Sequence, residues 1–258
     1  MLFFQISGEA ERNLFFIGVI YESIVLVISG ILLFFIVLKY LKKRHRLTLY
    51  LLLIFVFFAL AVIFSLISKI FVVLRLDLQV NPNTPYGWIF FRILSFRVSE
   101  FFVCIAIFLT YVLKVKIFQE RFNKTQKYIV IIFGSFTAFY DLVIYQAEHS
   151  STAVLLDAIA FLLTLIFMAM IYLVFMYRML EAYKHVERPI FRKAFLSLAI
   201  MAISFILIFV CFLIDRILIL LLDIPGFTLF YYLAWAFTII GILCAYLGYI
   251  RPEAGELK

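Results

Sequence analysis

The sequence predicts an all-α polytopic membrane bundle of seven transmembrane helices, with the amino terminus outside and the carboxyl terminus in the cytoplasm. Three observations carry this prediction. Hydrophobic residues make up 67% of the chain with a mean hydropathy of +1.17, long apolar runs recur, and the cations between these runs gather on one side. Soluble domains are only about half apolar and could not cover so much apolar surface.

The apolar runs give a single seven-helix domain, residues 1–258. The helices are expected at about 14–38, 49–74, 86–113, 128–147, 151–177, 194–222 and 227–250. Each run holds roughly 20 residues or more, enough for a helix to cross a hydrocarbon core of about 30 Å. The runs show no period-two alternation, which favours helices over a closed barrel. All five prolines lie in loops or at helix ends, so each helix is expected to be unbroken.

The positive-inside rule sets the predicted orientation. The loops after the first, third and fifth helices, together with the tail, hold 17 of the 23 Lys and Arg residues, whereas the opposite side holds only Arg12 and Arg75. The protein is therefore expected to be integral to the cell membrane, with the basic side in the cytoplasm. The net charge of +8 does not indicate nucleic-acid binding, because the cations are spread over separate loops.

Nine ionisable side chains lie within the predicted helices, mostly toward the outer face. A charge at such depth costs at least about 2.5 kcal/mol on insertion scales, so it should face the bundle interior, paired or hydrated. The carboxylates and cations are Glu22, Glu100, Asp141, Asp157, Asp215, Lys69, Arg92, Arg97 and Arg216. We expect an outward-facing pocket in the lipid bilayer, formed by Glu22, Lys69, Arg97, Glu100, Asp141, Asp157, Asp215, Arg216, Tyr231 and Trp235.

Two interpretations of this charged layer stay open. The side chains could coordinate a small polar or zwitterionic ligand, an ion or a lipid, or they could form a clamp of ion pairs that fixes helix register and binds nothing. Arg97 and Glu100 are i,i+3 neighbours and are expected to pair. The same pair is expected to join a network with Lys69, Asp141, Asp157 and Asp215.

Catalysis, cofactors and metals are not expected, so the protein is not predicted to be an enzyme. The three histidines lie in loops or at helix ends and the three cysteines lie inside helices, which leaves haem or zinc without converging ligands. The seventh predicted helix contains no lysine for a retinal Schiff base.

A weak internal similarity predicts a three-plus-one-plus-three plan with two parallel halves. Leu66–Ile70 is similar to Leu213–Ile217, and the same offset aligns Trp88 with Trp235. Self-similarity at a fixed offset is the mark of an internal repeat.

The short loops and the ending Tyr246 to Pro252 resemble stand-alone archaeal seven-helix membrane proteins and are similar to the seven-helix sensor region of some histidine kinases. We therefore expect a receptor-like sensor whose inner loops, including residues 180–193, contact a separate cytoplasmic protein. The alternatives are a small-solute or ion transporter built from two triple-helix halves, and a structural or assembly protein. Transporters often use interrupted helices at their binding sites, so unbroken helices favour the sensor.

Overall fold

The computed structural model describes residues 9–44, 46–76, 80–81, 83–118, 124–144, 151–222 and 227–250. Within these ranges the regular elements are helical, which confirms the all-α prediction. They are α1 (Glu9–Lys43), α2 (Arg46–Val73), α3 (Pro85–Leu94), α4 (Arg97–Ile117), α5 (Lys124–Val143), α6 (Ser151–His185), α7 (Pro189–Leu222), α8 (Leu229–Ala245) and a π-helix, η2 (Tyr246–Ile250). The last residues of the predicted range 128–147 lie outside the described ranges.

Within the described residues six helices are long and apolar enough to cross a membrane, namely α1, α2, α4, α6, α7 and α8, the last together with most of η2. The outer surface of the bundle carries large apolar side chains. Among them, Val27, Ile132 and Leu221 are 63%, 67% and 72% exposed. Apolar surface on this scale is suited to lipid and would drive association in water. The chain is therefore an integral membrane protein.

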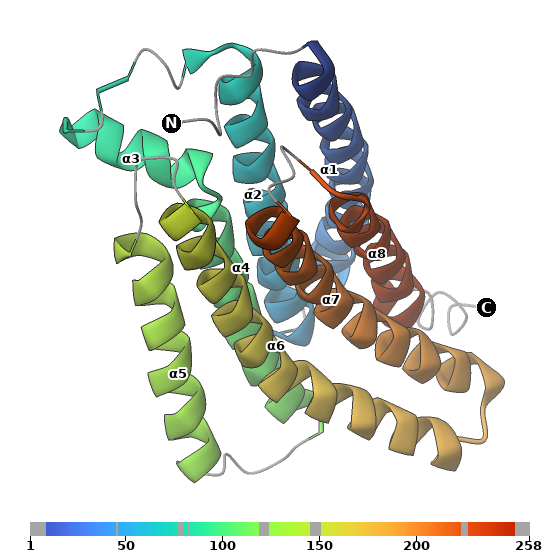
Figure 1. Ribbon diagram of the computed structural model, residues 1–258. Helices are drawn as coiled ribbons and strands as arrows, with labels where there is room; N and C mark the ends of the chain where they lie inside the picture. The colour runs from blue at the N-terminus through green and yellow to red at the C-terminus, as the bar shows by residue number, and fades with distance from the viewer. Residues whose placement is uncertain are drawn as a thin grey trace.

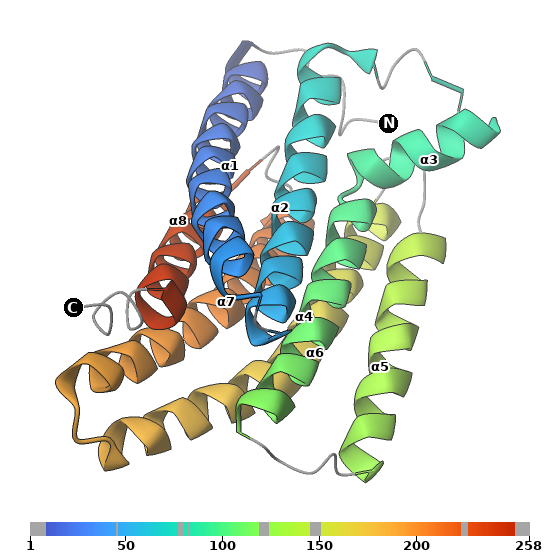
Figure 2. The ribbon, with the colours of Figure 1, turned by 180° about the vertical axis from the view of Figure 1, so that it is seen from behind.

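The six candidate spans form a closed ring (Figures 1 and 2). Along the ring α1 packs on α2, α2 on α4, α4 on α6, α6 on α7 and α7 on α8, and α8 returns to α1. Helix α5 lies at the edge of the bundle and packs on α4 and α6. It has 20 residues and carries Lys124, Lys127 and Asp141. Unlike the ring helices, α5 is not apolar enough to count as a candidate membrane span.

The prediction of one unbroken helix over 86–113 is wrong. Helix α3 ends at Leu94, the chain turns through Ser95 and Phe96, and α4 begins at Arg97. Figure 1 shows α3 lying across the upper end of the bundle, the end at which α1 begins and α2 ends. Phe96 has a φ of 62°, a left-handed conformation that is rare for a bulky side chain. Neither proline nor glycine stands at the break, so the sequence gives no local signal for it.

Specific hydrogen bonds hold α3 in this position. The Gly87 backbone N–H donates to the Thr84 hydroxyl at 3.0 Å, which caps the start of α3. At its other end, the Ser68 hydroxyl of α2 donates to the Leu94 carbonyl at 3.0 Å. The Arg92 guanidinium donates to the Leu142 carbonyl of α5 at 2.5 Å, where helix carbonyls lack partners within the helix. These bonds satisfy backbone groups at both ends of α3 and at the end of α5.

Helices α6 and α7 extend beyond the lower end of the ring. They have 35 and 34 residues, about 50 Å at about 1.5 Å per residue, which exceeds a hydrocarbon core. Over residues 180–193, α6 continues to His185, residues 186–188 interrupt the helix, and α7 begins at Pro189. Arg178 and Glu181 pair at 3.1 Å on the exposed surface of this extension.

Gly134 gives the first testable prediction. A Cβ placed there would lie 2.5 Å from Cζ of Phe167, which is completely buried in α6. Gly134→Ala should therefore destabilise the protein by about 1–3 kcal/mol, as overpacking does, and lower the melting temperature in detergent. Gly30→Ala is the matched control, because nothing lies within 4 Å of a Cβ at that position. Equal melting temperatures for the two variants would show that α5 does not need this close approach.

Candidate functional site

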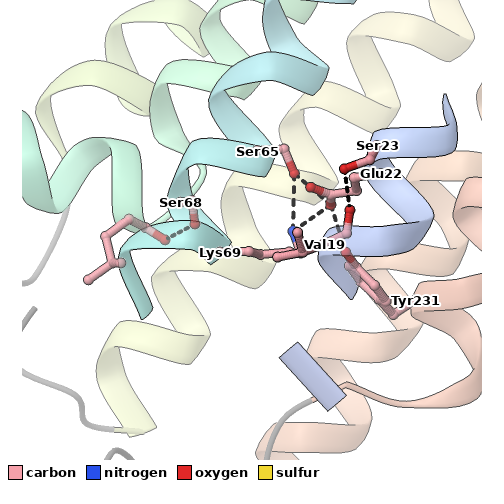
Figure 3. Close-up of polar contacts among 8 residues, drawn as sticks. Val19, Glu22, Ser23, Ser65, Ser68, Lys69 and Tyr231 are labelled. Carbon is pink, nitrogen blue, oxygen red and sulfur yellow. Dashed lines mark hydrogen bonds and ion pairs between the residues drawn. The ribbon is translucent and has the colours of Figure 1, made fainter. Parts of the chain in front are cut away.

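A buried ion pair joins α1 to α2 in the upper half of the bundle (Figure 3). Lys69 Nζ lies 2.5 Å from Glu22 Oε1, and both side chains are fully buried. The Ser65 hydroxyl and the Tyr231 hydroxyl donate to the same carboxylate oxygen at 2.9 and 2.6 Å. Lys69 also donates to the Ser65 hydroxyl oxygen at 3.2 Å. This group of four side chains therefore ties α1, α2 and α8 together.

Three aromatic rings surround the Lys69 ammonium. The ring centroids of Phe96, Tyr231 and Phe227 lie 4.4, 5.1 and 5.5 Å from Nζ. A cation over an aromatic face is stabilised by about 2 kcal/mol when both are desolvated. Since Phe96 is the left-handed residue between α3 and α4, its contact with Lys69 helps to hold the break in place.

A second group of charged side chains lies between α4, α5 and α6. Arg97 Nη2 lies 2.8 Å from Asp157 Oδ1 of α6, and Arg97 Nη1 lies 3.6 Å from Glu100 Oε2. The expected Arg97–Glu100 pair is thus present, but Asp157 is the closer partner. Asp141 of α5 accepts a weak hydrogen bond from the Cys104 thiol at 3.5 Å.

Asp215 fixes the connection between α7 and α8. Its Oδ1 accepts hydrogen bonds from the backbone N–H and the hydroxyl of Thr228, at 2.8 and 2.5 Å. Thr228 is the N-cap of α8, so the carboxylate also lies near the positive end of that helix. The structure thus separates Asp215 and Lys69 from Arg97 and divides the expected network into distinct groups.

A cavity of about 100 Å³ lies inside the ring, and all six ring helices contribute to its wall. Most of the wall is apolar or aromatic and includes Phe55, Phe58, Phe205, Ile208, Phe209 and Ile242. Its polar side chains toward the upper end are Ser65, Ser99, Glu100, Arg216, Tyr231 and Trp235. From Phe205 to Arg216 the wall follows α7 for about 16 Å at about 1.5 Å per residue. The cavity is therefore elongated, with a polar upper end and an apolar lower part.

Several polar groups at the upper end of the cavity have unused hydrogen-bonding capacity. Ser99 Oγ, Glu100 Oε1 and Trp235 Nε1 are buried without a hydrogen-bond partner among the residues described. Each such group costs about 1–3 kcal/mol, and native proteins contain few of them. Deeper in the cavity, the hydroxyls of Ser29 and Thr238 donate to carbonyls of their own helices at 2.8 and 3.0 Å. The unsatisfied wall groups are therefore concentrated at the polar end.

Arg216 enters the same end of the cavity from α7. Its Cζ lies 5.7 Å from the ring centroid of Phe96 and 5.8 Å from that of Phe161. Within the described ranges the guanidinium forms neither an ion pair nor a hydrogen bond, so its N–H groups are available to a ligand.

Four of the ten residues predicted for the site line the cavity, namely Glu100, Arg216, Tyr231 and Trp235. Glu22 and Lys69 contact the wall through Ser65 and Tyr231. The remaining four, which are absent from the wall, are Arg97, Asp141, Asp157 and Asp215. Sequence reasoning missed the aromatic wall residues Phe96, Phe161, Phe209 and Phe212, which nothing distinguishes among 33 phenylalanines.

A scan against protein-family models, a search of curated proteins and a search of solved structures each find no match to this chain. The resemblance to archaeal seven-helix proteins and kinase sensor regions therefore stays an expectation. Among the residues described, no group of three His, Cys, Asp or Glu side chains is placed to hold a metal ion.

The ion pair between Glu22 and Lys69 gives the second prediction. Lys69→Met or Glu22→Gln alone leaves one buried group without its partner and should destabilise the protein by about 3–5 kcal/mol. The double variant should lose less than the sum of the two single losses, measured by thermal unfolding in one detergent. Arg178→Met and Glu181→Gln are matched controls, since that pair is 44% and 45% exposed and should contribute little. Strictly additive losses at Glu22 and Lys69 would contradict the coupling.

Proposed function

We propose that this protein is a receptor-like membrane sensor that binds a single-chain amphiphile inside its helical ring. The observation that carries this proposal is the division of the cavity into an apolar lower part and a polar upper end with unsatisfied groups. Ligand sites are typically concave, largely apolar and equipped with a few polar groups that orient the ligand. A small ion or a wholly polar solute would find partners only at the polar upper end and would leave the apolar part of the wall without an apolar occupant.

The orientation with the amino terminus outside is part of this proposal, and so is a seventh span at α5. Helix α5 is 20 residues long, which corresponds to about 30 Å. Its side chains Tyr128, Ile132 and Phe136 are 62%, 67% and 53% exposed, as expected of a face in lipid. The α6–α7 extension at the lower end, with Arg178 and Glu181 on its exposed surface, is the proposed contact for a cytoplasmic protein.

A transporter is the second candidate, and two observations favour it. The break between α3 and α4 lies directly before Arg97 and Glu100, and interrupted helices are common at transporter binding sites. In addition, α1, α2 and α4 pack on one another in the same order as α6, α7 and α8, with α5 between the two triplets. This order supports the three-plus-one-plus-three plan as a proposal. If an amphiphile crosses proteoliposome membranes only when the protein is present, the protein is a transporter.

The cavity is tested with the fluorescence of Trp235. Trp88→Phe leaves Trp235 as the single tryptophan, because the chain contains two. Bromododecanol, a neutral chain with a quenching bromine, should quench Trp235 saturably in lipid nanodiscs. Val62→Phe fills the cavity wall and should abolish the saturable component, whereas Val27→Phe, at a side chain that is 63% exposed, should leave it unchanged. Quenching that rises linearly with the probe in both variants would reflect partitioning into lipid and reject the cavity as a binding site.

Cysteine labelling tests the orientation. A cysteine at Asn83 should react with an impermeant thiol reagent added outside cells, while cysteines at Lys124 and Arg188 should react only after the cells are opened, as the positive-inside rule implies. All three positions are exposed. The natural Cys104 and Cys211 are buried and Cys244 is half-buried, so they give a low background. The reverse labelling pattern would place the polar end of the cavity on the cytoplasmic side.

A further inference from the structure

The polar end of the cavity presents two opposite charges that are not paired with each other. Glu100 reaches the wall from α4 and Arg216 reaches it from α7. Glu100 has one oxygen 3.6 Å from Arg97, while Oε1 has no partner among the described residues. Arg216 lies near two ring faces and forms no ion pair with the residues that the structure describes. A cavity end that presents an acid and a base, with no ion pair between them among the described residues, suits a ligand that carries both charges.

We propose that the ligand of this cavity is a zwitterionic single-chain amphiphile, whose acidic group binds Arg216, whose ammonium group binds Glu100, and whose hydrocarbon chain lies in the apolar lower part. This inference rests on the proposed function, because it specifies the headgroup of the amphiphile. The apolar part of the wall, with Phe55, Phe205 and Ile208, suits the hydrocarbon chain.

Other buried charges near the cavity are already engaged. The Lys69 ammonium contacts Glu22 and Ser65, and Tyr231 donates its hydroxyl hydrogen to Glu22. Asp157 pairs with Arg97 and does not line the cavity. Glu100 and Arg216 are thus the charged side chains of the described wall, and they decide which headgroup the cavity accepts.

A singly charged headgroup fits this end less well than a zwitterion. A fatty acid would satisfy Arg216 but would add a negative charge near Glu100 and leave Oε1 unbonded. An alkyl amine would satisfy Glu100 but would add a positive charge near Arg216. Unbonded buried groups and like charges both weaken binding. A neutral alcohol would leave both charges without a counter-charge.

The remaining geometry supports an acidic group at Arg216. Phe96 and Phe161 contact the guanidinium through their ring faces, so its N–H donors can bind both oxygens of a carboxylate or phosphate. Trp235 Nε1 and Ser99 Oγ add two buried donors at the same end that have no partner among the described residues.

The test compares four brominated chains in the Trp88→Phe protein in nanodiscs. The probes are bromododecanol, bromododecanoic acid, bromododecylamine and a bromo α-aminododecanoic acid, which is zwitterionic at neutral pH. The amino acid should quench Trp235 at a concentration at least about tenfold lower than the other three, because hydrogen bonds to charged groups are strong. Arg216→Gln and Glu100→Gln should each raise the concentration at which the amino acid quenches Trp235 by about tenfold. Arg178→Gln and Glu181→Gln, at the exposed pair on α6, should leave it unchanged.

The two variants should also change which singly charged probe binds better. In Arg216→Gln the amine should bind more tightly than the acid, and in Glu100→Gln the acid should bind more tightly than the amine. Unchanged quenching by bromododecanol shows that each variant keeps its cavity, so a misfolded variant is recognised directly.

The outcomes separate the headgroup from the cavity. The proposal of a zwitterionic ligand would be overturned if all four probes quenched Trp235 at the same concentration, or if neither substitution changed the concentration at which the amino acid quenches. Either result would leave the cavity as a binding site. If the acid alone binds most tightly and depends only on Arg216, the ligand is anionic and the assignment to Glu100 is wrong. If none of the probes quenches Trp235 saturably, the proposed function itself is wrong.

Discussion

The arrangement of the upper half of this bundle depends on the ion pair between Glu22 and Lys69. Two fully buried charges in a membrane protein are tolerable only when each neutralises the other and further hydrogen bonds complete the site. Ser65 and Tyr231 supply those bonds from α2 and α8, so one carboxylate oxygen connects three helices. The same interaction closes the ring, because α8 must return to α1 for the Tyr231 hydroxyl to reach Glu22.

The same pair also contacts the break between α3 and α4. The Lys69 ammonium attracts the ring face of Phe96 at 4.4 Å, and a continuous helix would present a different surface to it. The left-handed conformation of Phe96 costs roughly 1–2 kcal/mol, an amount that one desolvated cation–π contact can offset. Phe96 also lies near Arg216 and lines the cavity, so the ring that contacts Lys69 forms part of the polar end as well.

The helices were predictable because lipid permits few backbone structures and each apolar run has to satisfy its own hydrogen bonds. The break at Phe96 was not predictable, since neither proline nor glycine stands there and the side chains that contact it, Lys69 and Ser68, lie on another helix. The pairing of Lys69 with Glu22 was equally unpredictable from the sequence. Helices that are apolar on every side give no periodic signal for their rotation, so the sequence shows which charges are buried and not which of them meet.

Burial of charge alone does not identify the binding groups in this protein. Glu22 and Asp215 are buried, and each uses an oxygen to hold several donors that fix helices or a turn. Arg97 and Asp141 keep unsatisfied atoms but lie away from the cavity wall. Glu22 Oε2 and Asp215 Oδ2 also lack a hydrogen-bond partner among the described residues, so unused capacity alone does not identify a binding group either. Among the described residues, the charged side chains that combine a place on the wall with unused capacity are Glu100 and Arg216, and this combination is what distinguishes them from the charges that only hold helices together.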